Sequence, residues 1–363
     1  MSINRSIADL LRSHSTIPTA AAPGKNLVQN GSMAVAQRAT QTGLGASTAY
    51  TQVDRFKLFC SGTAARVTAD QAAAGGVTGQ GNALKVDVTT ADASVASGDI
   101  MSIKHIIEAQ NCQLLRYGDS TAKDVTLSFW MKSPKTGTHC VSLYQSDTGR
   151  GYIKEFTIAS ANTWEQFKIT FPGDTGGAGI NDDTGSGLNI DWPLICGTGE
   201  QGSADSWLAS GKTATSNQQN LTDNTSNDVY LTGVQLELDS ATDFEHEGYG
   251  TTLRKARRYY WEFLTATDAG IATCKNYSTT IAHGTIWHPG MRATPTLTVS
   301  DATDFKVNIH GSSVHCTGMA IQWNTEDLST IAATVASGLT AGYAGSIMFD
   351  GSGTRSFALI AEL

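Results

Sequence analysis

Apolar and polar positions alternate with a period of two along most of the chain after residue 25, which predicts β-strands. The clearest case is the segment 124–132, in which Val125, Leu127, Phe129 and Met131 share one face and Trp130 lies on the other. Similar alternation predicts strands over 54–59, 82–88, 100–107, 140–144, 152–158, 164–171 and 228–238. Many short strands joined by glycine-rich turns predict an antiparallel β-sandwich.

Two further segments complete the first region. A short strand is predicted over 26–33, where the chain passes through an Asn-Gly turn. The segment 172–225 is rich in Gly, Asp, Asn, Ser and Thr, so it predicts a long surface loop that carries Trp192 and Trp207. Long loops on β-sandwiches often bind a ligand or pack against a neighbour.

A second β region follows an acidic turn and a basic segment near residue 250. Strands are predicted over 281–287, 296–300, 305–309 and 319–323, and the segments 346–349 and 356–360 are expected to form a final hairpin. The predicted fold is therefore all-β. It has a short N-terminal helical or extended arm over 1–25, a β-sandwich domain over 26–250 and a smaller β domain over 251–363.

The arm has its own pattern. Ile3, Ile7, Leu10 and Leu11 fall on one face of a short helix. About three turns of helix are marginal alone in water, so this apolar stripe needs a surface to cover it. The stripe predicts either an arm that anchors the chain to another protein or a helix packed on its own domain.

Composition narrows the functional classes. The net charge is −8, which argues against a nucleic-acid partner. No apolar run is long enough to insert into a membrane. The six cysteines are far apart in the sequence and form no CxxC pair, so we expect buried free thiols and no metal site or cofactor.

Several blocks of sequence resemble bacteriophage tail fibres and other virion fibre proteins that carry a jelly-roll domain like a carbohydrate-binding module. The blocks occur in the order that these fibres show, and the most specific ones lie near the predicted boundary. They are the residues 26–31 (NLVQNG), 53–56 (VDRF), 125–132 (VTLSFWMK), 162–171 (NTWEQFKITF), 234–245 (VQLELDSATDFE), 257–261 (RRYYW) and 291–295 (MRATP).

This resemblance implies a trimeric, non-enzymatic virion protein that is assembled in the host cytoplasm. It implies fibre function without identifying the part of the virion that carries the fibre. Together with the arm, the ordered blocks favour a tail fibre, in which Ile3, Ile7, Leu10 and Leu11 dock on a tail adaptor or nozzle and the β domains face the host surface. A head-attached fibre or capsid decoration protein is an alternative within the same class. A lectin-like glycan-binding module is an alternative of another class.

Glycan binding requires aromatic faces for stacking on sugar rings and polar groups for the hydroxyls. Trp192 and Trp207 are candidates because the predicted loop is polar, and Trp130 is a candidate because it lies on the polar face of its strand. A core position is the alternative for Trp130, and a subunit contact is the alternative for the two loop residues.

Clustered acids near residue 240 raise the possibility of a hydrolase, because such an enzyme needs paired carboxylates. These acids stand beside a basic segment, so ion pairing across the domain seam explains them better. The seam residues are Glu237, Asp243, Glu245, Arg254, Arg257 and Arg258. The chain contains neither a Gly-x-Ser-x-Gly nor a His-Glu-x-x-His motif, and no catalytic residue is predicted.

Overall fold

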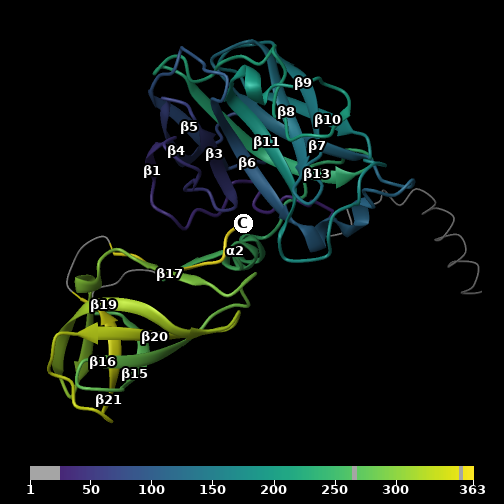
Figure 1. Ribbon diagram of the computed structural model, residues 1–363. Coiled ribbons are helices and arrows are strands. Elements are labelled where there is room, and N and C mark those ends of the chain that lie inside the picture. The colour runs from purple at the N-terminus through teal and green to yellow at the C-terminus, as the bar shows by residue number, and fades with distance from the viewer. Residues whose placement is uncertain (1–24, 264–267, 351–354) are drawn as a thin grey trace, which may run out of the picture.

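The computed structural model describes residues 25–263, 268–350 and 355–363, and within them the chain is almost entirely antiparallel β-structure (Figure 1). The predicted all-β fold, a sandwich followed by a second β region, is confirmed. The predicted arm falls almost wholly on residues 1–24, which lie outside the described residues.

The first region is a sandwich of two sheets. Its six-stranded sheet has the order β1 (Gln41–Leu44), β4 (Arg66–Ala73), β5 (Asn82–Thr90), β13 (Asp228–Leu238), β7 (Val125–Lys132) and β10 (Glu165–Phe171). Its seven-stranded sheet has the order β12 (Trp207–Leu208), β9 (Gly151–Ile158), β8 (Gly137–Gln145), β11 (Ser186–Cys196), β6 (Ile100–Glu108), β3 (Phe56–Ser61) and β2 (Ala49–Tyr50). The inward positions of both sheets form one large core.

The second region contains a closed barrel and a small sheet. The barrel is formed by β15 (Gly270–Asn276), β16 (Ile281–Trp287), β20 (Leu328–Val335), β19 (Ser312–Asn324), β18 (Phe305–Ile309) and β21 (Ala344–Phe349). Strands β14 (Tyr260–Glu262), β22 (Phe357–Ile360) and β17 (Thr296–Val299) form the three-stranded sheet. This region has its own core, centred on Phe305, Phe349 and Phe357.

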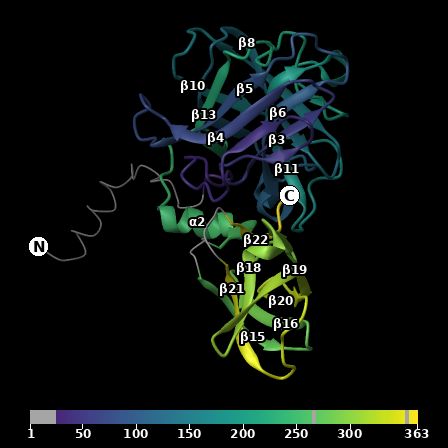
Figure 2. The ribbon, with the colours of Figure 1, turned by 90° about the vertical axis from the view of Figure 1, so that its left-hand side faces the viewer.

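Helical structure is short. Helix α2 (Tyr249–Arg257) lies between the two regions, and its basic last turn suits the negative end of the helix dipole (Figure 2). The 3-10 turns are η1 (Ala109–Leu115), η2 (Thr198–Glu200) and η3 (Ala302–Asp304). Among the described residues, none of the helices has the length and apolar character needed to cross a membrane.

Three local predictions were wrong. Residues 26–33 form turns instead of a strand. The segment 172–225 is not one surface loop, because it contains β11, which pairs with β6 and β8 inside the seven-stranded sheet. The expected final hairpin does not form either, since β21 belongs to the barrel and β22 pairs with β14 and β17.

Candidate functional site

A dense network of polar contacts lies where the sandwich meets the second region. It is a buried cluster formed by Arg38, Asp54, Arg55, Tyr259, Tyr260 and Glu362, which we call the junction cluster. The first three residues come from the sandwich and the last three from the second region. The chain end labelled C in Figures 1 and 2 lies at this place, between the two β regions.

Glu362 is the central acid of the cluster. Arg38 donates to one of its carboxylate oxygens over 2.8 Å, and Arg55 donates to the other over 2.7 Å. The side chain of Glu362 is only 6% exposed, so both ion pairs are shielded from solvent. Removing either arginine would leave a buried carboxylate with less compensation for its charge, so the loss of either partner is expected to destabilise the fold.

Arg55 contacts residues of both regions. Its guanidinium lies 3.4 Å above the ring centre of Tyr259, and it donates to the Ile106 carbonyl and the Gln29 side chain. Arg55 adopts φ 73°, a left-handed conformation that is uncommon outside glycine. Arg55 lies just before β3, and its contacts with Glu362 and Tyr259 of the second region offset the backbone strain of about 1 kcal/mol or more.

Two tyrosines from the start of the second region complete these contacts. Tyr260 lies under the Arg38 guanidinium at 3.6 Å. The Tyr259 hydroxyl donates to the Glu108 carboxylate, which also accepts two bonds from Arg258 at 3.1 and 3.2 Å. Burial raises the pKa of Glu108, but the bonds from Arg258 and Tyr259 outweigh burial and leave it below its ordinary value.

Arg292 ties the small sheet to the sandwich. Its guanidinium donates to the carbonyls of Ala361 and Glu362, and it reaches across to the Thr184 carbonyl over 2.6 Å. Its backbone N–H bonds the Arg258 carbonyl over 2.8 Å. Ion pairs, cation–π stacking and hydrogen bonds to backbone carbonyls thus link the two regions.

Asp54 makes the junction sensitive to pH. Burial raises the pKa of Asp54 to about 6, although Arg38 and Gln37 oppose that rise. In the unfolded chain the pKa is near 3.8, so between about pH 4 and pH 6 the folded protein binds the extra proton. The stabilising effect of this proton is complete below pH 3.8 and is lost as the pH rises towards 6.

We therefore expect Asp54→Asn to flatten the pH dependence of stability over this window. The wild-type free energy of unfolding should fall by roughly 2–3 kcal/mol relative to the variant between about pH 4 and pH 6. Urea unfolding at closely spaced pH values measures this difference. If the free energy of unfolding depends on pH in the same way in the two proteins, Asp54 is already ionised at pH 4.

The seam prediction needs correction for Arg258, whereas an ion pair of the expected kind does join the acidic turn to helix α2, between Glu247 and Lys255. Arg258 crosses to Glu108, not to the acids near residue 240. Glu237 accepts bonds from Thr242, the Asp243 carbonyl accepts one from Gln235, and Glu245 accepts one from the Asn26 backbone. Arg254 donates to Thr251, and the buried Nε of Arg257 has no hydrogen-bond partner among the described residues.

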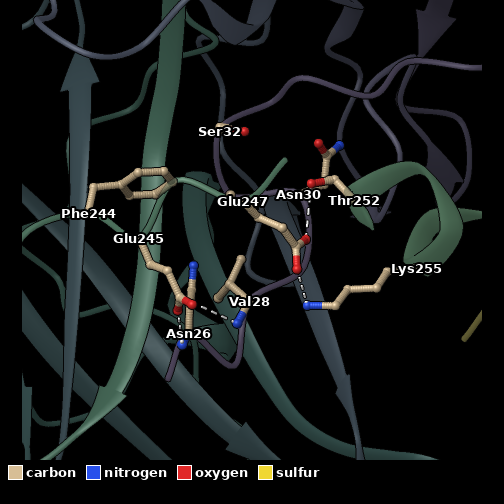
Figure 3. A pocket seen from close by; sticks show the side chains of 10 residues that line it. Asn26, Val28, Asn30, Ser32, Phe244, Glu245, Glu247, Thr252 and Lys255 are labelled. Carbon is tan, nitrogen blue, oxygen red and sulfur yellow. Dashed lines mark hydrogen bonds and ion pairs between the residues drawn. The ribbon is translucent and has the colours of Figure 1, made fainter. Parts of the chain in front are cut away.

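A small polar cavity lies beside this seam, between residues 26–32, the turn at 244–247 and helix α2 (Figure 3). Its wall includes the ion pair between Glu247 and Lys255 at 2.6 Å and a bond from Thr252 to Glu247. Its volume is about 30 Å³, which accommodates one or two water molecules and no sugar ring. The cavity is therefore too small to serve as a glycan site.

The three tryptophans proposed from sequence as ligand contacts have different environments. Trp192 is 1% exposed and packs edge-on against Phe129 in the sandwich core, so the prediction of a ligand contact was wrong for it. Trp207 lies half-buried on the edge strand β12, donates to the Pro172 carbonyl, and packs against Tyr117 and Tyr152. These contacts give Trp207 a structural role.

Trp130 is the candidate whose position leaves it accessible. It lies half-exposed on the outer face of β7, opposite Thr232 and Gln166 on the neighbouring strands. Gly233 makes room for its ring, because a Cβ there would lie 3.0 Å from the indole. On the same strand face, Lys132 lies 3.9 Å from the Tyr230 ring. This face combines aromatic and hydrogen-bonding groups, as a sugar-binding surface requires.

Other predicted chemistry has these outcomes. All six cysteines are buried and free, as expected, and burial raises the pKa of Cys274 to about 11. Within the described ranges, no cluster of three or more His, Cys, Asp or Glu side chains is arranged to hold a metal ion.

Comparisons with known proteins give fold-level likeness only. No family model matches the chain, and no curated protein matches it. The enzymatically active domain of tailspike protein 4 from bacteriophage CBA120 is 13% identical at a TM-score of 0.31, over 59% of this chain and 22% of that one. A family 11 carbohydrate-binding module from Clostridium thermocellum, in complex with a mixed-linked tetrasaccharide, is 14% identical at 0.28, over 52% of this chain and 91% of that module.

A third similar structure is a putative sugar-binding protein from Bacteroides thetaiotaomicron, at 12% identity and a TM-score of 0.30, over 59% of this chain and all of that one. This chain spans less than a quarter of the length of the tailspike domain. Identities and TM-scores this low transfer no function to this chain.

Proposed function

We propose that this chain is a non-enzymatic structural protein of a phage virion, a homotrimeric tail fibre that docks through residues 1–25 and presents its β regions to the host surface. The observation that carries the proposal is the convergence of the fibre-like sequence blocks on the junction. Four blocks supply it: 26–31, 53–56, 257–261 and 291–295. The residues that carry the resemblance therefore hold two β regions in one orientation.

Rigid coupling supports a fibre more than an enzyme. Two-domain enzymes commonly bind substrate in the cleft between domains, and domains in one chain usually move unless their interface is extensive. Here Glu362 and its two arginine partners form a buried ionic contact between the two regions. A stiff connection transmits position along a projecting fibre, whereas it prevents closure around a substrate.

The docking proposal is tested by deleting residues 1–25. The truncated protein should keep the oligomeric mass and the unfolding profile of the full chain, because the junction and both cores lie after residue 25. It should be missing from purified particles, as detected by immunoblot. Particles that carry the truncated protein at the normal level would disprove docking through the arm.

Two measurements address the remaining alternatives of this proposal. Native mass spectrometry of the purified chain decides whether it is a trimer. Immunogold labelling of particles distinguishes a tail fibre from a head-attached fibre or capsid decoration protein.

A glycan-binding module is the second candidate function, and the Trp130 face is the observation that favours it. Stacking on the half-exposed indole and bonding to the exposed Gln166 side chain would suit a sugar. The glycan array described in the next subsection, performed with Trp130→Ala, tests this candidate.

A further inference from the structure

The outer face of the barrel carries a row of exposed aromatic side chains that the junction and the sandwich do not explain. Tyr277 is 67% exposed and stacks on His283 with ring centres 4.8 Å apart and an interplanar angle of 20°. His283 meets the ring of Trp323 edge-on at 5.3 Å, and Trp323 is 59% exposed. We call Tyr277, His283 and Trp323 the aromatic row.

Strand register explains how these rings come together. His283 on β16 pairs with Ala332 on β20, and Ala332 pairs with Ala320 on β19. These alanines project only methyl groups, so the ring of Trp323 can lean across the sheet towards His283. Trp287 extends the same face of β16 and is 74% exposed. The row therefore runs across the strands, with a fourth ring farther along β16.

Polar groups lie between and beside the rings. Thr285 and Thr330 face each other across β16 and β20 with their hydroxyl oxygens 3.4 Å apart, and Thr330 also pairs with Trp323. Lys275 is in register with His283 on the neighbouring strand β15 and is exposed. The face thus offers flat aromatic surfaces, two hydroxyls and one ammonium group, and the partly exposed Leu328 lies beside Trp287.

We propose that this face binds a glycan chain, with sugar rings stacked on Tyr277, Trp323 and Trp287 and hydroxyls bonded by Thr285, Thr330 and Lys275. The rings are partly ordered before binding because Tyr277 and Trp323 both rest on His283, which lowers the entropic cost of stacking. The inference rests on the attachment role proposed above and adds a ligand class and a place for it.

The size of the face favours a glycan over a second copy of this chain. The exposed parts of the three large rings amount to roughly 300–500 Å², whereas a stable protein interface buries about 800 Å² on each partner. A patch of this smaller size is typical of a functional site on a monomer surface. It suits a few sugar rings of an extended polysaccharide.

The purified full chain is tested on an array of bacterial surface polysaccharides, with affinity measured on any glycan that it retains. Trp323→Ala and Tyr277→Ala should each weaken binding by on the order of tenfold, and Trp323→Phe should keep most of it because a stacking face remains. Tyr249→Ala is the matched control, since Tyr249 is 58% exposed on helix α2, away from the row. It should bind as the wild type does.

Three results would overturn the glycan-binding proposal for the aromatic row. A blank array with the wild-type protein, or binding that is lost in Trp130→Ala and retained in Trp323→Ala, overturns the proposal. A change in native mass caused by Trp323→Ala would show that the row is a subunit contact. None of these outcomes depends on where the protein sits on a particle, so failure here is distinguishable from failure of the fibre assignment.

Discussion

Replacing Arg55 with alanine is expected to lower the free energy of unfolding by roughly 3–5 kcal/mol, the effect of removing one partner from a buried ion pair. The variant leaves Glu362 without one of its two guanidinium partners in a site where its side chain is 6% exposed. It also removes the cation stacked on Tyr259 and the donor to the Ile106 carbonyl. Urea unfolding, followed by tryptophan fluorescence, measures the loss.

The matched control is Arg116→Ala. Arg116 pairs with Asp119 at the surface, where the two side chains are 53% and 55% exposed, so its loss should change stability by no more than about 0.5 kcal/mol. The double variant Arg55→Ala/Glu362→Ala should be less destabilised than the sum of the two single variants, because the residues act as a pair. A loss below about 1 kcal/mol for Arg55→Ala would contradict a coupling role for the junction.

The same variant reports on rigidity. If the junction cluster holds the two β regions in one orientation, small-angle scattering should show a larger radius of gyration for Arg55→Ala under conditions where both cores remain folded. Arg116→Ala should scatter as the wild type does. Identical scattering for all three proteins would mean that the other interregion bonds, including those of Arg292, suffice to fix the orientation.

The strands were predictable from sequence wherever the alternation was uninterrupted. The segment 125–132 is a strand in the structure, and its apolar positions Leu127 and Phe129 face the core. Strand β11 was missed although Leu188 and Ile190 alternate with Asn189 and Asp191. Glycine, aspartate and serine on both sides of it resembled a loop.

Strand β11 also has buried polar positions, which sequence patterns assign to solvent. Asp191 is only 1% exposed, and its burial is tolerated because Ser102 and Lys104 on β6 bond its carboxylate. Such a partner is visible only once the strands are paired. Alternation of apolar and polar residues therefore fails to predict a central strand whose buried polar side chains have partners on the neighbouring strand.

The junction was beyond sequence reasoning for a related reason. Arg55 and Glu362 are separated by 307 positions, and no local pattern links them. Sequence proximity instead suggested that the acids near residue 240 pair with the basic segment that follows them, whereas Arg258, the residue after helix α2, bonds Glu108, 150 positions away. The fibre-like blocks include Asp54, Arg55, Tyr259 and Tyr260, but Arg38 and Glu362 lie outside them.

Trp192→Ala is expected to have the second large effect, a loss of roughly 3–5 kcal/mol in the free energy of unfolding. Trp192 is 1% exposed and touches the ring of Phe129, with centroids 5.7 Å apart, so alanine would leave a cavity between the two sheets. Its Nε1 has no hydrogen-bond partner among the described residues, so the ring contributes by packing alone. Urea unfolding again measures the change.

Trp192→Phe separates packing from any role of the indole nitrogen. Phenylalanine keeps most of the ring and removes an unpaired buried donor, so we expect a loss of no more than about 1.5 kcal/mol. A loss as large as that of Trp192→Ala would instead reveal a bond made by Nε1. Because Trp192→Ala weakens the whole sandwich, a decrease in glycan binding by that variant would not identify Trp192 as a contact. Trp130→Ala and Trp323→Ala change accessible rings, so only they can distinguish the two faces on which a sugar could stack.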